Sequence, residues 1–483
     1  KKFFEPASVA VVGASRTPGK VGYDVVSNLI RSGFEGPVYP VNPNAEGILG
    51  LRCYPSLSAI ARPVDLAVIV VPARFVLEVI DQCAQADVRA VIVISAGFKE
   101  SGPEGAELEE ELARRCAQHA VRLIGPNCLG VISPPHRLNA SFSAAAPPPG
   151  NVGFFSQSGA MGTAVLDWFC GSEAQNLGIS RFVSYGNKAD VDESDLIEAL
   201  GEDDATDVIL GYVESIGNGR KFMEVAARVT KSKPVLILKS GRTSAGARAA
   251  VSHTGSLAGS DAAYEAAFRQ SGVIRARSVT EFFDYVLAFS RQAPPKGPSV
   301  AIVTNAGGPG ILATDAIESS SLRMATLKEA TQSHLAQELP RGANTHNPVD
   351  VIGDARADRY RLAIDALVQD DAVDAILAIL TPQTSTEVEA TAETIGDAAA
   401  RTEKPILAAF MGSLTAQRGA EVLQRRGVPS YPHPERAVTT LDAMYRFHCW
   451  SRARPEAAPR FEFDATAIES ALAQASRAGT KEL

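Results

Sequence analysis

The sequence predicts an α/β protein of three doubly wound domains, each with a largely parallel sheet covered by helices on both faces. The first supporting observation is length, because 483 residues correspond to roughly three domains of 100–200 residues. The second is an alternation of short Val/Ile-rich runs with longer Ala/Leu/Glu-rich segments, which is typical of buried parallel strands joined by helices. The third is an internal repeat in the second and third parts of the chain.

The first part of the chain predicts a Rossmann-like domain over residues 1–132. Its apolar runs are separated by segments of helix length, as in consecutive βαβ units. The Pro-rich stretch 134–150 predicts a linker to the next domain. The strands expected in this domain are 8–13, 37–42, 65–72, 90–97 and 122–125.

The second and third parts predict two flavodoxin-like domains, over 148–292 and 297–450, with 451–483 as a helix and tail. Each domain opens with a strand and a small-residue turn, continues with an Asn/Asp pair, and closes with a strand that follows Lys-Pro. The same features in the same order indicate duplication of one domain. The strands expected here are 152–156, 181–185, 207–214, 234–239, 299–304, 375–381 and 405–411.

Charge and composition narrow the class of protein. The net charge is −8 and Lys and Arg do not cluster, which argues against a nucleic-acid partner but leaves phosphorylated ligands open. No apolar run approaches the roughly 18 residues of a membrane span, and no signal peptide precedes the first strand. Six scattered cysteines without a C-x-x-C pair fit a reduced compartment and neither a zinc site nor a disulfide frame. We therefore expect a cytoplasmic protein, and residue 1, a Lys, indicates a trimmed or partial chain.

His253 is the residue that points most directly to chemistry. It lies in a loop of small residues after the strand 234–239, where an imidazole is poorly placed for packing. A histidine there can attack a phosphoryl group, carry it as phosphohistidine and pass it on. Glu214 ends the strand 207–214 and fits a carboxylate that orients the imidazole. The alternatives are an exposed or capping histidine and a surface carboxylate at a strand end.

A glycine turn after the first strand predicts a phosphate site, because the following helix presents free amides and a dipole. It lacks the G-x-G-x-x-G fingerprint, and the second strand ends in Asn42 and Pro43 rather than in the acidic residue that binds an NAD ribose. The positive charge of Arg16 and Lys20 favours coenzyme A over NAD, and the departures from the dinucleotide pattern disfavour a nicotinamide-dependent oxidoreductase. A structural glycine turn is the alternative. The turn residues are Gly13, Ala14, Ser15, Arg16, Lys20 and Gly22.

Residues after the later strands of this domain would line the same sheet edge. Asn127 suits a hydrogen bond to a ligand carbonyl or a simple turn cap, and Pro72 also fits a chain reversal. Cys128 is a possible nucleophile, but the sequence identifies no base beside it. The edge residues expected to bind ligand are Val71, Pro72, Ser95, Ala96, Gly97, Phe98 and Asn127.

Two further helix starts, one in each later domain, predict phosphate binding. Small residues at both starts leave backbone amides open, so together they would form an anion hole without a metal ion. Ordinary strand–helix turns are the alternative. The residues are Ser156, Ser158 and Gly159 in the second domain and Gly307 and Gly308 in the third.

With the segments Ile124-Gly-Pro-Asn-Cys-Leu-Gly130 and Ser252-His-Thr-Gly-Ser256, these motifs resemble the NDP-forming acyl-CoA synthetases, the superfamily that includes succinyl-CoA ligase. The chain looks like the alpha part of the ADP-forming members, a CoA-binding domain followed by two ligase-CoA domains. The resemblance implies interconversion of acyl-CoA, ADP and phosphate with carboxylic acid, CoA and ATP, through an acyl phosphate and a phosphohistidine. It implies that His253 carries the phosphate, that Glu214 steadies it, and that the first domain holds CoA.

The resemblance also implies a part that this sequence lacks. We find no ATP-grasp domain, which would supply the ATP/ADP site and Mg²⁺, so a separate beta subunit or a fused domain is expected as partner. An oligomer is expected for the same reason. The alternative function is the ligand-sensing, CoA-binding portion of a fused protein acetyltransferase, although retention of His253 and Glu214 argues against an inactive sensor. The small carboxylic acid is not specified by the sequence.

Overall fold

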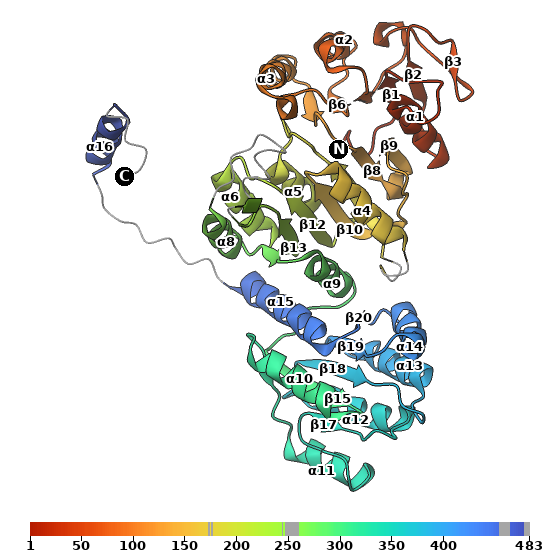
Figure 1. Ribbon diagram of the computed structural model, residues 1–483, viewed down its shortest axis with the longest axis vertical. Helices are drawn as coiled ribbons and strands as arrows, with labels where there is room; N and C mark the ends of the chain where they lie inside the picture. Colours follow the sequence, from red (N-terminus) through yellow and green to blue (C-terminus); the bar gives the residue numbers. More distant parts are fainter. Residues whose placement is uncertain (172–173, 175–176, 244, 247–259, 454–463, 478–483) are drawn as a thin grey trace. The chain divides into compact units, whose positions relative to one another are not determined.

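A computed structural model describes the chain from residue 1 to residue 477, apart from residues 172–173, 175–176, 244, 247–259 and 454–463. His253 therefore lies outside the described residues. The chain divides into two compact units, Lys1–Ser451 and Arg452–Leu483. Helix α16 (Ala465–Arg477) is the regular element of the second unit (Figure 1). Three large sheets and the two-stranded sheet of β3 (Gly47–Ile48) and β4 (Leu51–Arg52) belong to the first.

The first sheet has five parallel strands in the order β2-β1-β5-β6-β7. Its strands are short and consist mostly of Val, Ile, Leu and Ala, and every residue of β1 is buried, as expected where helices cover both faces. The strand order reverses between β1 and β5, which is where ligands bind in doubly wound sheets. The strands are β1 (Val9–Val12), β2 (Val38–Val41), β5 (Leu66–Ile69), β6 (Ala90–Val93) and β7 (Arg122–Ile124), and the helices are α1 (Val21–Arg31), α2 (Val76–Gln85) and α3 (Pro103–Gln118).

The second sheet has seven strands in the order β14-β13-β12-β10-β11-β8-β9. The five parallel strands follow the flavodoxin order 2-1-3-4-5. The parallel strands are β10 (Pro149–Ser156), β11 (Ile179–Ser184), β12 (Val208–Val213), β13 (Val235–Lys239) and β14 (Ile274–Ala276), and the helices are α4 (Gly159–Cys170), α5 (Glu193–Gly201), α6 (Gly219–Val229), α8 (Asp261–Gln270) and α9 (Val279–Phe289).

The linker predicted over 134–150 is wrong. Strand β8 (Gly130–Ser133) and strand β9 (Leu138–Ser141) form a hairpin that adds to the second sheet antiparallel to β11. All four residues of β9 are buried, so this stretch carries a strand despite its prolines. Pro134 and Pro135 instead lie in the turn of the hairpin, and Pro149 is the first residue of β10, positions at which a strand tolerates proline.

The third sheet repeats the flavodoxin order, β16-β15-β18-β19-β20, with β17 also paired to β15. The predicted duplication is thus matched by two sheets of one topology. Its strands are β15 (Ser299–Thr304), β16 (Arg323–Met324), β17 (Val349–Asp350), β18 (Ala375–Leu380), β19 (Ile406–Phe410) and β20 (Ser430–Tyr431), and the helices are α10 (Gly307–Glu318), α11 (Glu329–Glu338), α12 (Ala357–Gln369), α13 (Val388–Ala399), α14 (Leu414–Arg425) and α15 (Pro434–Arg452).

Helix α15 ties the third sheet's domain to the second. Arg436 donates from Nε to the carboxylate of Asp284 on α9, 2.7 Å away, and that carboxylate is nearly buried. Trp450 donates from Nε1 to Thr230 Oγ1 at 2.8 Å. Among the helices that the structure describes, none is both long enough and apolar enough to cross a membrane.

Candidate functional site

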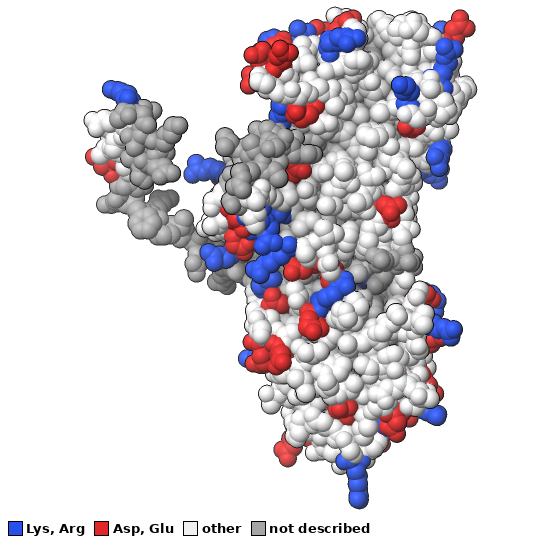
Figure 2. Space-filling view, viewed as in Figure 1, with Lys and Arg blue, Asp and Glu red and all other residues white. Residues whose placement is uncertain are grey.

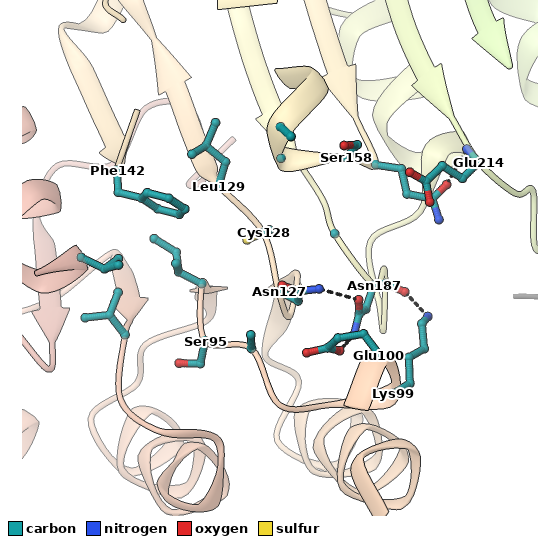
Figure 3. Close-up of a pocket in the computed structure, with 18 residues that line it drawn as sticks. Ser95, Lys99, Glu100, Asn127, Cys128, Leu129, Phe142, Ser158, Asn187 and Glu214 are labelled. Atoms are coloured by element: carbon teal, nitrogen blue, oxygen red, sulfur yellow. Dashed lines mark hydrogen bonds between the residues drawn. The ribbon is translucent and has the colours of Figure 1, made fainter. Parts of the chain in front are cut away.

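A cavity of about 500 Å³ lies where the carboxyl ends of strands from the first and second sheets face each other (Figure 3). One part of its wall is apolar, and the other carries amides, carboxylates, two serines and a lysine. The lining residues are Val21, Val70, Ile94, Ser95, Ala96, Lys99, Glu100, Asn127, Cys128, Leu129, Phe142, Gln157, Ser158, Gly159, Ala160, Gly186, Asn187 and Glu214.

The cavity brings together six of the residues that the sequence singled out. Ser95, Ala96 and Asn127 come from the first domain. Ser158, Gly159 and Glu214 come from the second. Residues that follow strands of two different sheets, up to 119 positions apart in the sequence, therefore line one cavity.

The glycine turn before α1 is shaped by close backbone contacts. Gly13 has a φ of +91°, and a Cβ at Gly22 would lie 2.2 Å from the Gly13 carbonyl oxygen, so the helix start packs directly on the turn. Ala14 is buried, and its carbonyl accepts a hydrogen bond from Asn42 Nδ2 at 2.7 Å. Asn42 thus holds the turn, with Pro43 next to it in the chain.

The charges beside this turn are accessible to a ligand. Arg16 and Lys20 are exposed, and Lys20, the N-cap residue of α1, makes no side-chain cap. Ser15 accepts a hydrogen bond from the Thr17 N–H at 3.1 Å and leaves the helix amides uncovered. An uncapped helix start with two nearby cations is suited to phosphate.

Other residues expected at this edge have different environments. The Phe98 side chain is fully buried in the core of the first domain. The N–H groups of Gly97 and Phe98 donate to Glu100 Oε1 at 2.6 and 3.1 Å, so a carboxylate of the chain already occupies them. Val71 packs against Gly13, where a Cβ would lie 3.0 Å from Val71 Cγ1, and Pro72 is exposed beside it.

Helix α4 begins at the cavity with a side-chain cap. Ser158 is its N-cap residue and accepts a hydrogen bond from the Met161 N–H at 3.3 Å. Ser156 is buried and donates from Oγ to the Ser158 carbonyl at 2.6 Å, so it supports the turn from inside. Of the predicted phosphate residues, Ser158 and Gly159 line the cavity, whereas Gly307 and Gly308 start α10 in the third domain and do not.

Glu214 follows β12 and is 8% exposed, so the surface-carboxylate alternative is wrong. Its N–H donates to Gln157 Oε1 at 2.9 Å, and the Ser215 N–H donates to the same oxygen at 3.1 Å. Burial raises the pKa of Tyr185, and the carboxylates of Glu193 and Glu214 raise it further. These contacts fix Glu214 in a partly apolar wall of the cavity.

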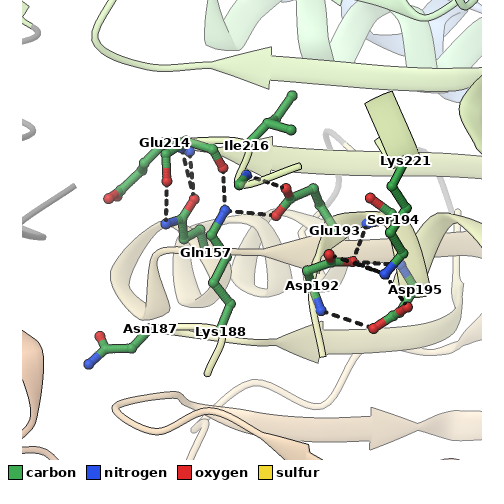
Figure 4. A network of polar contacts seen from close by, with 12 residues as sticks. Gln157, Asn187, Lys188, Asp192, Glu193, Ser194, Asp195, Glu214, Ile216 and Lys221 are labelled. Atoms are coloured by element: carbon green, nitrogen blue, oxygen red, sulfur yellow. Dashed lines mark hydrogen bonds and ion pairs between the residues drawn. The ribbon is translucent and has the colours of Figure 1, made fainter. Parts of the chain in front are cut away.

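A buried ion pair supports the loop after Glu214 (Figure 4). Lys188 Nζ lies 2.9 Å from Glu193 Oε2 and donates to the Ser215 carbonyl at 2.6 Å. Glu193 is fully buried and accepts from the Gly217 N–H at 3.1 Å. The pair has backbone partners on both sides, which is the condition for a buried ion pair to be retained without a large penalty.

Sequence reasoning missed a polar cluster at the cavity: Lys99, Glu100, Glu109 and Asn187. Figure 3 shows Lys99, Glu100 and Asn127 of the first domain directed toward Asn187 of the second. In the sequence, Asn187 stands out only as part of the Asn/Asp pair of the repeat, Glu100 follows β6 without any motif, and Glu109 lies within α3. For Glu100 and Asn187, the position after a strand at the carboxyl edge is the available signal.

Cys128 does not fit a nucleophile. It is 4% exposed, donates from Sγ to the Val93 carbonyl at 3.3 Å, and burial raises its pKa to about 12. A thiol of that pKa is protonated near neutral pH and unreactive.

Comparison with known proteins follows the same division of the chain. Family models match residues 7–134 as a CoA binding domain, 149–289 as a succinyl-CoA ligase like flavodoxin domain, and 300–456 as a ligase-CoA domain. The chain is 45% identical to the acetate--CoA ligase [ADP-forming] I of Archaeoglobus fulgidus over 92% of its length, and spans 63% of that protein. It is 42% identical to the alpha subunit of the Pyrococcus furiosus acetate--CoA ligase [ADP-forming] I, over 94% of this chain and 98% of that one.

A solved structure agrees over nearly the whole chain. Acetyl-coenzyme A synthetase 1 of Ca. Korarchaeum cryptofilum, in complex with phosphate and ADP, matches with a TM-score of 0.89 at 40% identity, covering 93% of this chain and 97% of that one. The fold and the cavity thus define an α/β protein with a CoA-binding domain and two ligase-type flavodoxin-like domains. The chain belongs to the ADP-forming acyl-CoA synthetase (acid–CoA ligase) family and corresponds to its alpha part.

Proposed function

We propose that the chain is the CoA-binding and phosphohistidine component of an ADP-forming acyl-CoA synthetase. With its partner it would interconvert acyl-CoA, ADP and phosphate with a carboxylic acid, CoA and ATP. The observation that carries the proposal is the shared cavity, in which Asn127 and the loop after β6 face Ser158 and Glu214. A thioester held from one side and a phosphate held from the other meet there.

CoA binds across the carboxyl edge of the first sheet in this proposal. Its phosphates lie at the start of α1, near the exposed charges of Arg16 and Lys20. Its pantetheine arm runs past Val21 and Val70 into the cavity, where the wall is apolar and Ser95 and Asn127 add polar contacts. This assigns the glycine turn and the loop 95–98 to one ligand.

Two transfers take place at the phosphate side of the cavity. Phosphate attacks the thioester carbon, the carbon–sulfur bond breaks, and acyl phosphate and CoA thiol result. His253 then attacks the phosphorus, releasing the carboxylate and keeping the phosphoryl group. The start of α4, with Ser158 and Gly159, stabilises the negative charge on the phosphoryl oxygens. Glu214 accepts a hydrogen bond from one imidazole nitrogen and leaves the other free to attack.

The nucleotide half of the reaction belongs to an ATP-grasp domain or subunit, which would supply the ADP site and Mg²⁺. One relative is a separate alpha subunit of matching length, which supports a separate subunit as partner. The Archaeoglobus fulgidus relative is a longer chain, which supports a fused domain instead. The relatives reported above are named as CoA ligases or synthetases, so the protein acetyltransferase alternative gains no support from them.

The phosphoprotein itself provides the test. Incubation of the chain with a nucleotide-binding subunit of a close relative and labelled ATP should give an acid-labile, base-stable phosphoprotein. His253→Ala should abolish the label, and persistence of the label in that variant would exclude His253 as the carrier. In parallel, CoA but not NAD should raise the melting temperature of the chain.

A further inference from the structure

We propose that Asn187 is a positioning residue for the thiol end of CoA, acting through its contacts to Asn127 and Glu100. The inference rests on the proposed function, because it assumes that CoA enters this cavity. It adds a second-domain residue to a binding site that was assigned from first-domain motifs alone. The ligand it concerns is the pantetheine arm, and not the nucleotide end of CoA.

The side-chain amide of Asn187 uses each of its hydrogen-bonding positions on the first domain. Its Nδ2 donates to Glu100 Oε2 at 2.5 Å and to Glu109 Oε2 at 2.8 Å. Its Oδ1 accepts from Asn127 Nδ2 at 3.3 Å. Asn187 is 6% exposed, so these contacts do not compete with bulk water.

The backbone around Asn187 is held equally firmly. Its N–H donates to the Pro126 carbonyl at 2.9 Å, and the Ala189 N–H donates to the Gly125 carbonyl at 3.0 Å. A Cβ at Gly186 would lie 2.2 Å from the Asn127 carbonyl oxygen, so only glycine permits this approach. These backbone hydrogen bonds hold the loop after β11 against the loop after β7, and we call this contact between the first two domains the seam.

Two carboxylates and one lysine surround the amide of Asn187. Lys99 Nζ lies 3.1 Å from Glu109 Oε1 and also donates to the Asn187 carbonyl. Burial opposes ionisation of Glu100, but hydrogen bonds from Asn187 and from the Gly97 and Phe98 N–H groups prevail and lower its pKa. Glu100 is thus a carboxylate at neutral pH, and it requires the donor that Asn187 supplies.

The hydrogen bonds of Glu100 and Asn187 form a clamp on the residues that we expect around the thiol end of CoA. Glu100 fixes the loop 95–98 by taking two of its N–H groups, while Asn187 fixes Glu100 and Asn127 together. Ser95, Ala96 and Asn127, the predicted contacts of the pantetheine arm, all line the cavity beside that clamp. An Asp at position 187 is isosteric but cannot donate, so it would turn the clamp into three converging carboxylates.

The test compares two ligands on the full chain: CoA, and adenosine 3′,5′-bisphosphate, which lacks the pantetheine arm. Calorimetry should show that Asn187→Asp lowers the affinity for CoA about tenfold or more, which is the effect expected when a charge-assisted hydrogen bond is lost. Affinity for the bisphosphate should stay within about twofold, since its contacts are at the start of α1. If the affinities for both ligands fell equally, or if neither affinity fell, the proposal would be overturned.

A matched control shows whether an Asn→Asp change lowers CoA affinity only at the cavity or wherever it places two carboxylates together. Asn151 donates from Nδ2 to Asp207 Oδ2 at 2.8 Å, away from the cavity, so Asn151→Asp creates a similar clash of carboxylates. It should leave CoA affinity unchanged, and a loss like that of Asn187→Asp would count against a positioning role. Adding Glu100→Gln to Asn187→Asp restores a donor–acceptor pair and should recover part of the lost affinity, whereas no recovery would contradict the clamp.

A second variant keeps the test decisive if Asn187→Asp does not fold. Glu100→Gln keeps an oxygen for the Gly97 and Phe98 N–H groups but loses the charge, and should weaken CoA severalfold with the bisphosphate unaffected. Unchanged CoA affinity in this variant would overturn the proposal. Absence of CoA binding by the unsubstituted chain is a different result, since it would overturn the proposed function itself.

Discussion

The second and third domains build the same turn from different residues, and only one of them builds a site with it. At the end of β10, Ser156 donates to the carbonyl two residues on at 2.6 Å, and at the end of β15, Thr304 does the same at 2.9 Å. The next residue is an amide in both: Gln157 accepts from the Glu214 N–H, and Asn305 accepts from the Thr381 N–H, each at 2.9 Å. In each case that N–H follows the neighbouring strand, β12 or β18.

We call this shared turn, with its amide contact to the neighbouring strand, the frame. The two domains differ in the side chains that the frame carries. In the second domain, the helix start has the Ser158 cap and the neighbouring strand is followed by Glu214, and both line the cavity. In the third, α10 begins after Ala306 without a side-chain cap, and Thr381 takes the place of Glu214. The frame is thus a property of the duplicated fold, and the chemistry resides in a few substitutions on it.

The largest expected effect separates Glu214 from its counterpart. Glu214→Gln should slow formation of the phosphoprotein by about 100-fold, because the imidazole loses the carboxylate that selects its tautomer. Thr381→Val should leave that rate unchanged. Initial rates of labelling from ATP, with CoA affinity measured alongside, check both. Loss of CoA binding in Glu214→Gln would instead indicate damage to the fold of the cavity.

The second comparison tests whether Gln157 and Asn305 are equivalent supports. Removing either amide leaves buried N–H groups without an acceptor, so Gln157→Ala and Asn305→Ala should each lower the free energy of unfolding by about 2 kcal/mol. Only Gln157→Ala should also slow labelling of the chain, since it frees the backbone of Glu214. Denaturant melts and labelling rates distinguish the cases, and equal slowing in both variants would contradict the division of roles.

A smaller effect is expected at the helix start. Ser158→Ala removes an N-cap and should cost about 1 kcal/mol of stability, with a slower phosphoryl transfer because the site loses a hydroxyl. Ala306→Ser introduces a cap residue at the uncapped start of α10 and should raise the melting temperature without affecting transfer. A Ser158→Ala enzyme with unchanged transfer would restrict that hydroxyl to a structural role.

The sequence predicted every strand of the first sheet and the longer parallel strands of the other two, because buried parallel strands and helix-length segments leave strong patterns. It missed the short strands β14, β16, β17 and β20. It also predicted the turns that meet at the cavity, since strand ends in a parallel sheet share an edge. The sequence did not predict the role of a residue where that role depends on contacts between distant segments of the chain. Nothing local distinguishes Ser156, which is buried support, from Ser158, which lines the cavity.

The same limit hid the hairpin of β8 and β9 and the cluster around Asn187. The prolines of 134–150 resemble a linker until β9 is seen paired to β8 at the edge of the second sheet. Glu100 and Asn187 are 87 positions apart and contact only because two domains meet. Phosphate binding at Gly307 and Gly308 was predicted from the small residues at a helix start, and neither glycine lines the cavity that the other motifs share.

The smallest predicted effect concerns pH and compares a carboxylate at the cavity with one in the third domain. The pKa of Glu100 is lowered in the folded protein, so its contribution to stability is present above its usual value of 4.5 and is lost as the pH falls through the folded-state pKa. The difference in melting temperature between wild type and Glu100→Gln should therefore be a few degrees near pH 7 and shrink below pH 4.5.

Asp354 provides the contrast, because Arg359 lowers its pKa in the same direction at the protein surface. Solvent screens that pair, so Asp354→Asn should leave the melting temperature nearly unchanged at every pH. Similar pH profiles for the two variants would mean that the hydrogen bonds of Glu100 add nothing beyond an exposed ion pair. A profile unique to Glu100→Gln would instead show that the seam between the first two domains depends on an ionised carboxylate, as the clamp on Asn187 requires.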